Sequence, residues 1–312
     1  MATIIEVRDL TKRYRGASTN AVDAVSFSVE SGQFFALLGP NGAGKTTTIS
    51  MLTTTLAPTS GSAQIAGHDL VRDAAGVRGD VGIIFQRPSL DQNLTGEENV
   101  RLHVLLYGLY KWRPSYSFMP AEYRAALHDM AQLLGIGESI FKPIRTYSSG
   151  MRRKLEIVRA LLHRPRVLFL DEPTAGLDVP TRRMLWDHLT RVRRESGTTI
   201  FLTTHYIEEA ETADSICIID HGKIVSFGTP DEVKANLVQH YVDVDAADRA
   251  ALCDELARLG VRYVEGQHVR VELDGMSTHA LLKSIDLPLD YIQTHSPTLE
   301  DAYLGIVSKG EP

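Results

Sequence analysis

The segment "GPNGAGKTT", from Gly39 to Thr47, contains the residue types that bind phosphate. It fits the pattern G-x-x-x-x-G-K-[ST], and it lies between an apolar run that predicts a buried strand and a segment with helical spacing. Glycines allow backbone N–H groups to turn toward phosphate oxygens, and the N-terminus of a helix adds a favourable dipole. In this pattern Lys45 reaches the β- and γ-phosphates, and the Thr46 hydroxyl is a magnesium ligand. The predicted phosphate-binding residues are Gly39, Asn41, Gly42, Gly44, Lys45, Thr46 and Thr47.

Two carboxylates follow a second apolar run, "VLFLDEP". Asp171 ends the predicted strand and is suited to hold magnesium, and Glu172 comes directly after it. Hydrolysis of ATP needs a water positioned near the γ-phosphate, and a carboxylate next to the magnesium site can orient or deprotonate that water. On their own, two acids in this place also suit an ordinary turn or helix start. The upstream phosphate loop favours the catalytic interpretation.

A single histidine, His205, ends a third predicted strand, "TTIFLTTH". A histidine in such a place is often only structural. At the carboxyl edge of a parallel sheet, where ligands bind, it can instead contact the γ-phosphate. We predict that contact here.

The elements between these residues predict an α/β fold. Apolar strand patterns alternate with amphipathic helix patterns, which is typical of a largely parallel sheet covered by helices. Thr95 and Glu98 form a T-x-x-E capping box that predicts a helix start. The stretch from about residue 87 to 163 is mostly helical in pattern and interrupts the strand–helix alternation, so we expect it to be an inserted helical subdomain.

The pattern changes after residue 238. From Gln239 onward the order of predicted elements is β-α-β-β-α-β, which indicates a small ferredoxin-like domain. We therefore expect two domains, residues 1–238 and 239–312.

Composition narrows the possible functions. The chain has 312 residues with 33 Lys+Arg against 39 Asp+Glu, a net charge of −6 that gives no reason to expect nucleic-acid binding. Its two cysteines, Cys217 and Cys253, lie in apolar segments and are expected to be buried and reduced. The N-terminal segment lacks the apolar core of a signal peptide, and no run approaches the roughly 18 apolar residues of a membrane span. We expect a cytosolic protein, or one bound to a membrane through a partner.

Taken together, residues 4 to about 235 resemble the nucleotide-binding subunit of an ATP-binding cassette (ABC) transporter. The resemblance implies ATP and Mg²⁺ as cofactors, Glu172 as the catalytic acid–base group and His205 as the switch histidine. It implies that Tyr14 stacks on adenine, although a plain strand tyrosine is the alternative. It also implies that Gln86 senses magnesium and the attacking water, and that Asp178, in "AGLD", crosses to the other subunit.

The segment "YSSGM" falls where the family signature L-S-G-G-Q lies. Its terminal tyrosine and methionine resemble the daunorubicin-resistance-like branch, which contains ATPases of drug, antibiotic and lipid or polysaccharide exporters. Ser149 departs from that branch's usual Y-S-G-G-M, whereas Ser148 and Gly150 match it, so we expect the phosphate contact to survive. The C-terminal "SPTLEDAYLGIVSKG" resembles the ending common in the same branch.

The resemblance implies that two cassettes face head to tail and sandwich two ATP molecules, each between one phosphate loop and the opposite signature helix. We expect a homodimer at the cytoplasmic face of a membrane, energising a separate permease for efflux. The aromatic-rich "RLHVLLYGLYKWRPSYSF" is a candidate for the permease contact, with a core helix and surface loop as the alternative. An importer ATPase and a soluble cassette ATPase acting on ribosomes or DNA are the competing functions. The latter usually carries two cassettes or a long coiled coil, and this chain has one phosphate loop.

Overall fold

The computed structural model describes residues 2–85, 89–175, 177–237, 241–273, 276–295, 298–300 and 303. The chain divides into two compact units, Met1–Phe227 and Gly228–Pro312. The division lies before the expected boundary at residue 238, because helix α8 (Pro230–Leu237) belongs to the second unit.

A six-stranded sheet forms the centre of the first unit, with strand order β10-β9-β3-β8-β7-β6. Neighbouring strands run parallel from β9 through β3, β8 and β7 to β6, which confirms the predicted parallel α/β core. Every residue of β3, β7 and β8 is buried, as expected for strands covered on both faces. The strand bounds are β3 Phe34–Leu38, β6 Val81–Ile84, β7 Val167–Asp171, β8 Thr199–Thr204, β9 Ser215–Asp220 and β10 Lys223–Gly228.

A second sheet of the first unit has the order β2-β1-β4-β5, and its paired strands are antiparallel. The sequence patterns described above do not predict this sheet. Aromatic rings join the two sheets: Phe27 of β2 stacks on Phe35 of β3 at 5.4 Å between ring centroids, and Phe35 lies 4.8 Å from Phe201 of β8. One apolar core therefore serves both sheets. The strands are β1 Thr3–Lys12, β2 Val22–Glu30, β4 Ser60–Ile65 and β5 His68–Asp69.

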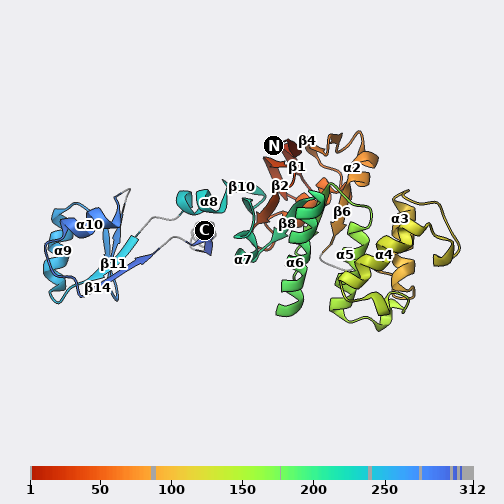
Figure 1. The fold of residues 1–312 in the computed structure, drawn as a ribbon. Coiled ribbons are helices and arrows are strands. Elements are labelled where there is room, and N and C mark those ends of the chain that lie inside the picture. The colour runs from red at the N-terminus through yellow and green to blue at the C-terminus, as the bar shows by residue number, and fades with distance from the viewer. Residues whose placement is uncertain are drawn as a thin grey trace. The chain divides into compact units, whose positions relative to one another are not determined.

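Three helices follow β6 and precede β7, where the sequence predicted a helical insertion, and Figure 1 shows them grouped beside that edge of the sheet. The predicted capping box is present: the Thr95 hydroxyl accepts from the Glu98 N–H, and the Glu98 carboxylate accepts from the Thr95 N–H. No described helix is both long enough and apolar enough to cross a bilayer. The helices of this unit are α1 Lys45–Leu52, α2 Ala74–Asp80, α3 Gly96–Leu106, α4 Ala121–Leu133, α5 Ser149–Leu161, α6 Val179–Ser196 and α7 Ile207–Ala210, with short 3₁₀ turns at Tyr116–Phe118, Gly137–Ser139 and Ile144–Thr146.

The second unit contains a four-stranded antiparallel sheet with strand order β12-β13-β11-β14. With the chain order β-α-β-β-α-β, this is the predicted ferredoxin-like topology. Alternate residues of β11 are buried, and Val242 and Val244 join the core beneath the helices. Cys217 is buried in the first unit and Cys253 is half-buried in the second; both are free thiols. The elements are β11 Tyr241–Asp245, α9 Arg249–Arg258, β12 Tyr263–Glu265, β13 Val269–Glu272, α10 Thr278–Ser284 and β14 Tyr291–His295.

Candidate functional site: a phosphate-binding pocket

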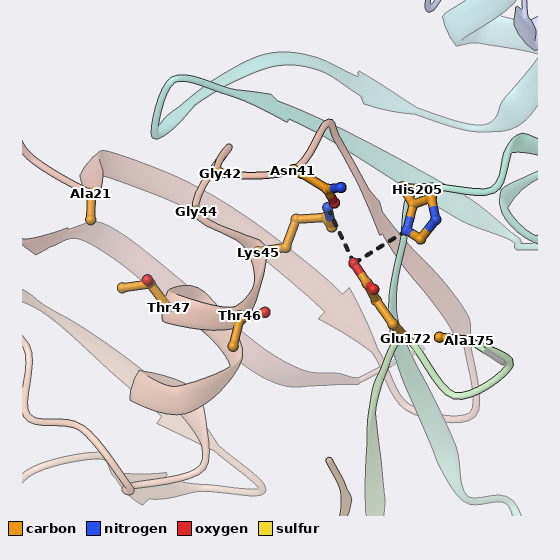
Figure 2. Close-up of a pocket in the computed structure, with 10 residues that line it drawn as sticks. All are labelled: Ala21, Asn41, Gly42, Gly44, Lys45, Thr46, Thr47, Glu172, Ala175 and His205. Carbon is orange, nitrogen blue, oxygen red and sulfur yellow. Dashed lines mark ion pairs between the residues drawn. The ribbon is translucent and has the colours of Figure 1, made fainter. Parts of the chain in front are cut away.

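An open pocket of about 430 Å³ lies at the carboxyl ends of the central parallel strands. Ligands of open parallel sheets bind at this edge, because the loops that leave the strands converge there. Figure 2 shows the loop before α1 on one side of the pocket and the side chains of Glu172 and His205 on the other. The lining residues are Ala21, Asn41, Gly42, Gly44, Lys45, Thr46, Thr47, Glu172, Ala175 and His205.

Glycine is required at two positions of the loop before α1. A Cβ on Gly39 would lie 2.3 Å from the Ile219 carbonyl oxygen, and one on Gly44 would lie 2.5 Å from the Ala21 carbonyl oxygen. Gly44 also has φ of 108°, a conformation that favours glycine. Gly44 is the N-cap of α1 and has no side chain to bond the first N–H groups of the helix. The first residues of the helix line the pocket, so an anion there can accept from their N–H groups.

Lys45 is almost completely buried, with 4% of its surface exposed. Its Nζ donates to the carbonyl oxygens of Gly39 at 2.7 Å and Pro40 at 3.0 Å, and lies 3.6 Å from Glu172 Oε1. Burial lowers the pKa of Lys45, and the neighbouring Glu172 carboxylate opposes that shift. The loop thus holds the ammonium group where it faces the pocket.

Glu172 is the second charged group of the pocket. Its Oε1 lies 3.6 Å from Lys45 Nζ and 3.3 Å from His205 Nδ1 (Figure 2). The backbone at Glu172 has φ of 45°, which costs a non-glycine residue about 1–2 kcal/mol. Its N–H donates to the Thr203 carbonyl at 3.0 Å, which ties the strained residue to β8. Backbone strain of this kind is often found at functional sites.

Asp171 lies next to the pocket at the end of β7 and is 2% exposed. Its Oδ1 accepts from the Thr203 hydroxyl at 2.6 Å and from the Thr46 hydroxyl at 3.3 Å. Burial raises the pKa of Asp171, and the two hydroxyl donors oppose the rise. The hydroxyl of Thr46 and the carboxylate of Asp171 are hard oxygen donors of the kind that suit Mg²⁺ shared with a substrate phosphate. The described residues contain no group of three or more His, Cys, Asp or Glu side chains able to hold a metal by themselves.

The sequence patterns did not indicate two residues that contact the site, Thr203 and Glu209. Glu209 is 5% exposed and accepts from the Thr204 hydroxyl at 2.6 Å and from the Thr174 hydroxyl. It therefore joins the turn after Glu172 to the end of the strand that precedes His205. Its position four residues after His205 was visible, but "IEEAE" offers three acids and no local sign of which one is buried.

Three other predicted residues lie at α5, outside the lining of this pocket. Ser148 is the N-cap of α5, and its hydroxyl accepts from the Met151 N–H at 3.2 Å. Ser148 and Ser149 are exposed, and Gly150 is half-buried. Ser148 and Ser149 thus give α5 an exposed N-terminus.

Of the other predicted residues, Tyr14 lies beside the pocket and Asp178 lies before α6. The Tyr14 hydroxyl lies 3.3 Å from the Thr47 hydroxyl, so this tyrosine borders the pocket, and it is 45% exposed. Asp178 is exposed and lies directly before α6. Gln86 lies outside the described residues, and its role stays a prediction.

The fold and the pocket define a P-loop ATPase. Residues 22–175 match the ABC transporter family. The chain is 41% identical over 250 residues to a daunorubicin/doxorubicin resistance ATP-binding protein of Streptomyces peucetius, covering 79% of this chain and 72% of that protein. It is 35% identical over 306 residues to a Nod factor export ATP-binding protein of Paraburkholderia xenovorans, covering 96% of each.

A solved structure of an ATP-binding subunit of an ABC transporter superposes with a TM-score of 0.66 at 31% identity, covering 75% of this chain and 93% of that one. The chain therefore belongs to the ABC transporter family. It contains the ATPase of such a transporter, binds nucleotide, and couples ATP hydrolysis to transport.

Proposed function

We propose that this protein is the ATPase subunit of an ABC exporter, and that it energises efflux of a drug, antibiotic or lipid-like substrate through a separate permease. The pocket is the main support for this proposal, because a phosphate loop, a buried lysine, a carboxylate and a histidine all line it. Likeness to export and resistance ATP-binding proteins extends along most of the chain. These relatives are named for chemically different substrates, which suggests that the permease selects the substrate.

In the proposed hydrolysis step, the γ-phosphate lies against Lys45 and the first N–H groups of α1. Glu172 orients the attacking water and accepts its proton, while Lys45 and His205 stabilise charge on the phosphate oxygens. Thr46 and Asp171 would hold magnesium, which neutralises part of the phosphate charge. The 3.3 Å contact between Glu172 and His205 would keep the carboxylate near the water.

A second copy of the chain would complete each site. The N-terminus of α5 is exposed, and the Ser148 hydroxyl, Gly150 and the helix N-terminus are suited to an anion. In a head-to-tail homodimer this segment would cover the γ-phosphate held by the other copy. ATP would then bind the closed dimer far more tightly than the open one, and hydrolysis would remove that difference.

The outer side of α3 and the loop after it would contact the permease at the cytoplasmic face of the membrane. Val100 and Val104 are buried, whereas Leu102 and Leu106 on the same helix are exposed. Leu109, Trp112 and Phe118 extend the exposed apolar surface beyond the helix. Apolar surface of this kind favours a protein partner.

Transport in inside-out vesicles tests the proposal. The chain is co-expressed with a candidate permease, expected to have about six membrane-spanning helices, and ATP-dependent accumulation of a fluorescent anthracycline is measured. The Lys45→Met variant is the matched control and should accumulate none. ATP-driven uptake in right-side-out vesicles instead would contradict the exporter and favour an importer.

A further inference from the structure

A buried ion pair on α5 lies outside the pocket and has no part in the hydrolysis step described above. Arg153 is 6% exposed and Glu156 is completely buried. The Nη1 group of Arg153 lies 3.0 Å from Glu156 Oε2, one helical turn along α5. Burial lowers the pKa of the Arg153 guanidinium, and the Glu156 carboxylate opposes that shift.

The pair connects α5 to the ends of two neighbouring parallel strands. Nη1 of Arg153 donates to the Phe85 carbonyl at 2.6 Å, directly after β6. Nε of the same guanidinium donates to the Pro173 carbonyl at 2.9 Å, directly after Glu172. The Arg153 side chain thus bonds to the backbone immediately next to the catalytic carboxylate.

Glu156 contributes the other half of the connection. Its Oε1 accepts from the Ser89 N–H at 3.1 Å, so the pair holds both Phe85 and Ser89, on either side of residues 86–88. Arg159 reinforces the contact by donating to the Ser89 carbonyl and hydroxyl, each at 2.8 Å. One face of α5 therefore bonds to three backbone positions of the first unit.

A contribution to folding stability does not by itself explain the buried pair of Arg153 and Glu156. A buried ion pair loses the hydration of both charges, and well-packed apolar residues in its place are often as stable or more stable. Arginine, however, can bond several carbonyl oxygens in fixed directions from one planar group. Arg153 uses this geometry, because two of its N–H groups donate to the carbonyls of Phe85 and Pro173.

We propose that Arg153, supported by Glu156, is a positioning residue for ATP hydrolysis. It fixes the turn after Glu172 against the end of β6 and the helix that begins at Ser148. The strained backbone at Glu172 needs such support, because its carboxylate must stay between Lys45 and His205. Arg153 therefore affects the turnover rate, and the affinity of the loop before α1 for nucleotide does not depend on it.

The double variant Arg153→Met with Glu156→Gln tests this role in the full chain. It removes both charges together, and the glutamine retains an oxygen for the Ser89 N–H. The expected result is a Tm close to that of the wild type, a KM for ATP little changed, and a kcat lower by about 10- to 100-fold, the effect of a small misplacement of a catalytic group. The control is Lys154→Met on the same helix, where the lysine is half-exposed and kcat should match the wild type.

Arg153→Lys is the second variant, and it tests the positioning role of Arg153 if the double variant does not fold. Lysine keeps the positive charge beside Glu156 but lacks the planar group that bonds both carbonyls. A reduced kcat at unchanged Tm supports the proposal. A wild-type kcat in either folded variant overturns it, as does a raised KM with unchanged kcat.

Discussion

Two helix N-termini of this protein have the chemistry to bind phosphate, and they are built differently. At α1 the N-cap is Gly44, no side chain caps the helix, and a buried lysine lies at the first helical position. At α5 the N-cap is Ser148, whose hydroxyl already accepts from the Met151 N–H, and both Ser148 and Ser149 are exposed. The first helix start lies in a pocket with Glu172 and His205, and the second lies outside it.

The difference shows what a helix N-terminus needs to become a catalytic site. Both helices present backbone N–H groups and the positive end of a dipole. Only at α1 do a buried cation, a carboxylate and a pocket of the same chain occur together. The start of α5 has a capped, exposed surface, and we propose that it acts on a phosphate held elsewhere, by a second copy.

Glu172→Gln should have the largest effect on ATP hydrolysis. It distinguishes the hydrolysis step from nucleotide binding at the α1 site. The amide keeps the shape of the side chain but cannot accept the proton of the attacking water. We expect ATP hydrolysis to fall by about 10²- to 10⁴-fold while ATP still binds. Phosphate release and nucleotide binding are measured side by side, and near-normal turnover would remove Glu172 from its role.

Lys45→Met should have the next largest effect and weakens the α1 site itself. The variant loses the charge that we propose faces the γ-phosphate, and it loses the bonds to the Gly39 and Pro40 carbonyls. We expect turnover to fall by about 10²- to 10³-fold, as when an electrostatic group of an active site is lost, together with weaker ATP binding. Titration with a fluorescent ATP analogue measures the binding, and unchanged affinity would contradict the assignment.

Ser148→Ala should have a modest effect, because it removes the cap of α5 and leaves the pocket untouched. Loss of a serine N-cap costs about 1 kcal/mol in the free energy of unfolding. Nucleotide affinity of the isolated chain should stay that of the wild type. Denaturant unfolding and ATP titration are the two measurements, and a large loss of ATP affinity in the monomer would place Ser148 in the pocket of its own chain.

Ser149→Gly should have the smallest effect. It restores the Y-S-G-G-M form at an exposed first position of α5. Glycine in a helix costs up to about 1 kcal/mol relative to good helix formers, and we expect turnover to change by less than about tenfold. The measurement is the steady-state ATPase rate of the wild type and of Ser149→Gly under the same conditions. A larger change in either direction would show that Ser149 affects the reaction.

The α1 site could be predicted from the sequence because its parts are local and ordered. Glycines, lysine and threonine follow one strand within a few residues, and Asp171 and Glu172 follow another. The parallel sheet then brings the strand ends together at one edge. Strand and helix patterns also predicted the ferredoxin-like unit, because the spacing of apolar residues differs between its strands and its helices.

The supporting residues could not be predicted in the same way. The segment "SGMRRKLEIVR" contains three arginines, and nothing local distinguishes the buried Arg153 from Arg152. The pairing of β1 with β4 joins residues 49 to 60 positions apart in the chain, from Thr11 with Ser60 to Ile5 with Ile65, which no periodic pattern specifies. Burial of Glu209 likewise depends on contacts with two strand ends that only the folded chain brings together.

We propose that ATP is held between the α1 pocket of one copy and the α5 start of another. Light scattering of the Glu172→Gln protein with and without ATP tests it most directly, with Glu172→Gln/Ser148→Arg as the partner variant. We expect ATP to double the mass of the first protein, whereas the second should bind ATP but stay monomeric. An ATP-induced dimer of equal stability in both proteins would contradict it.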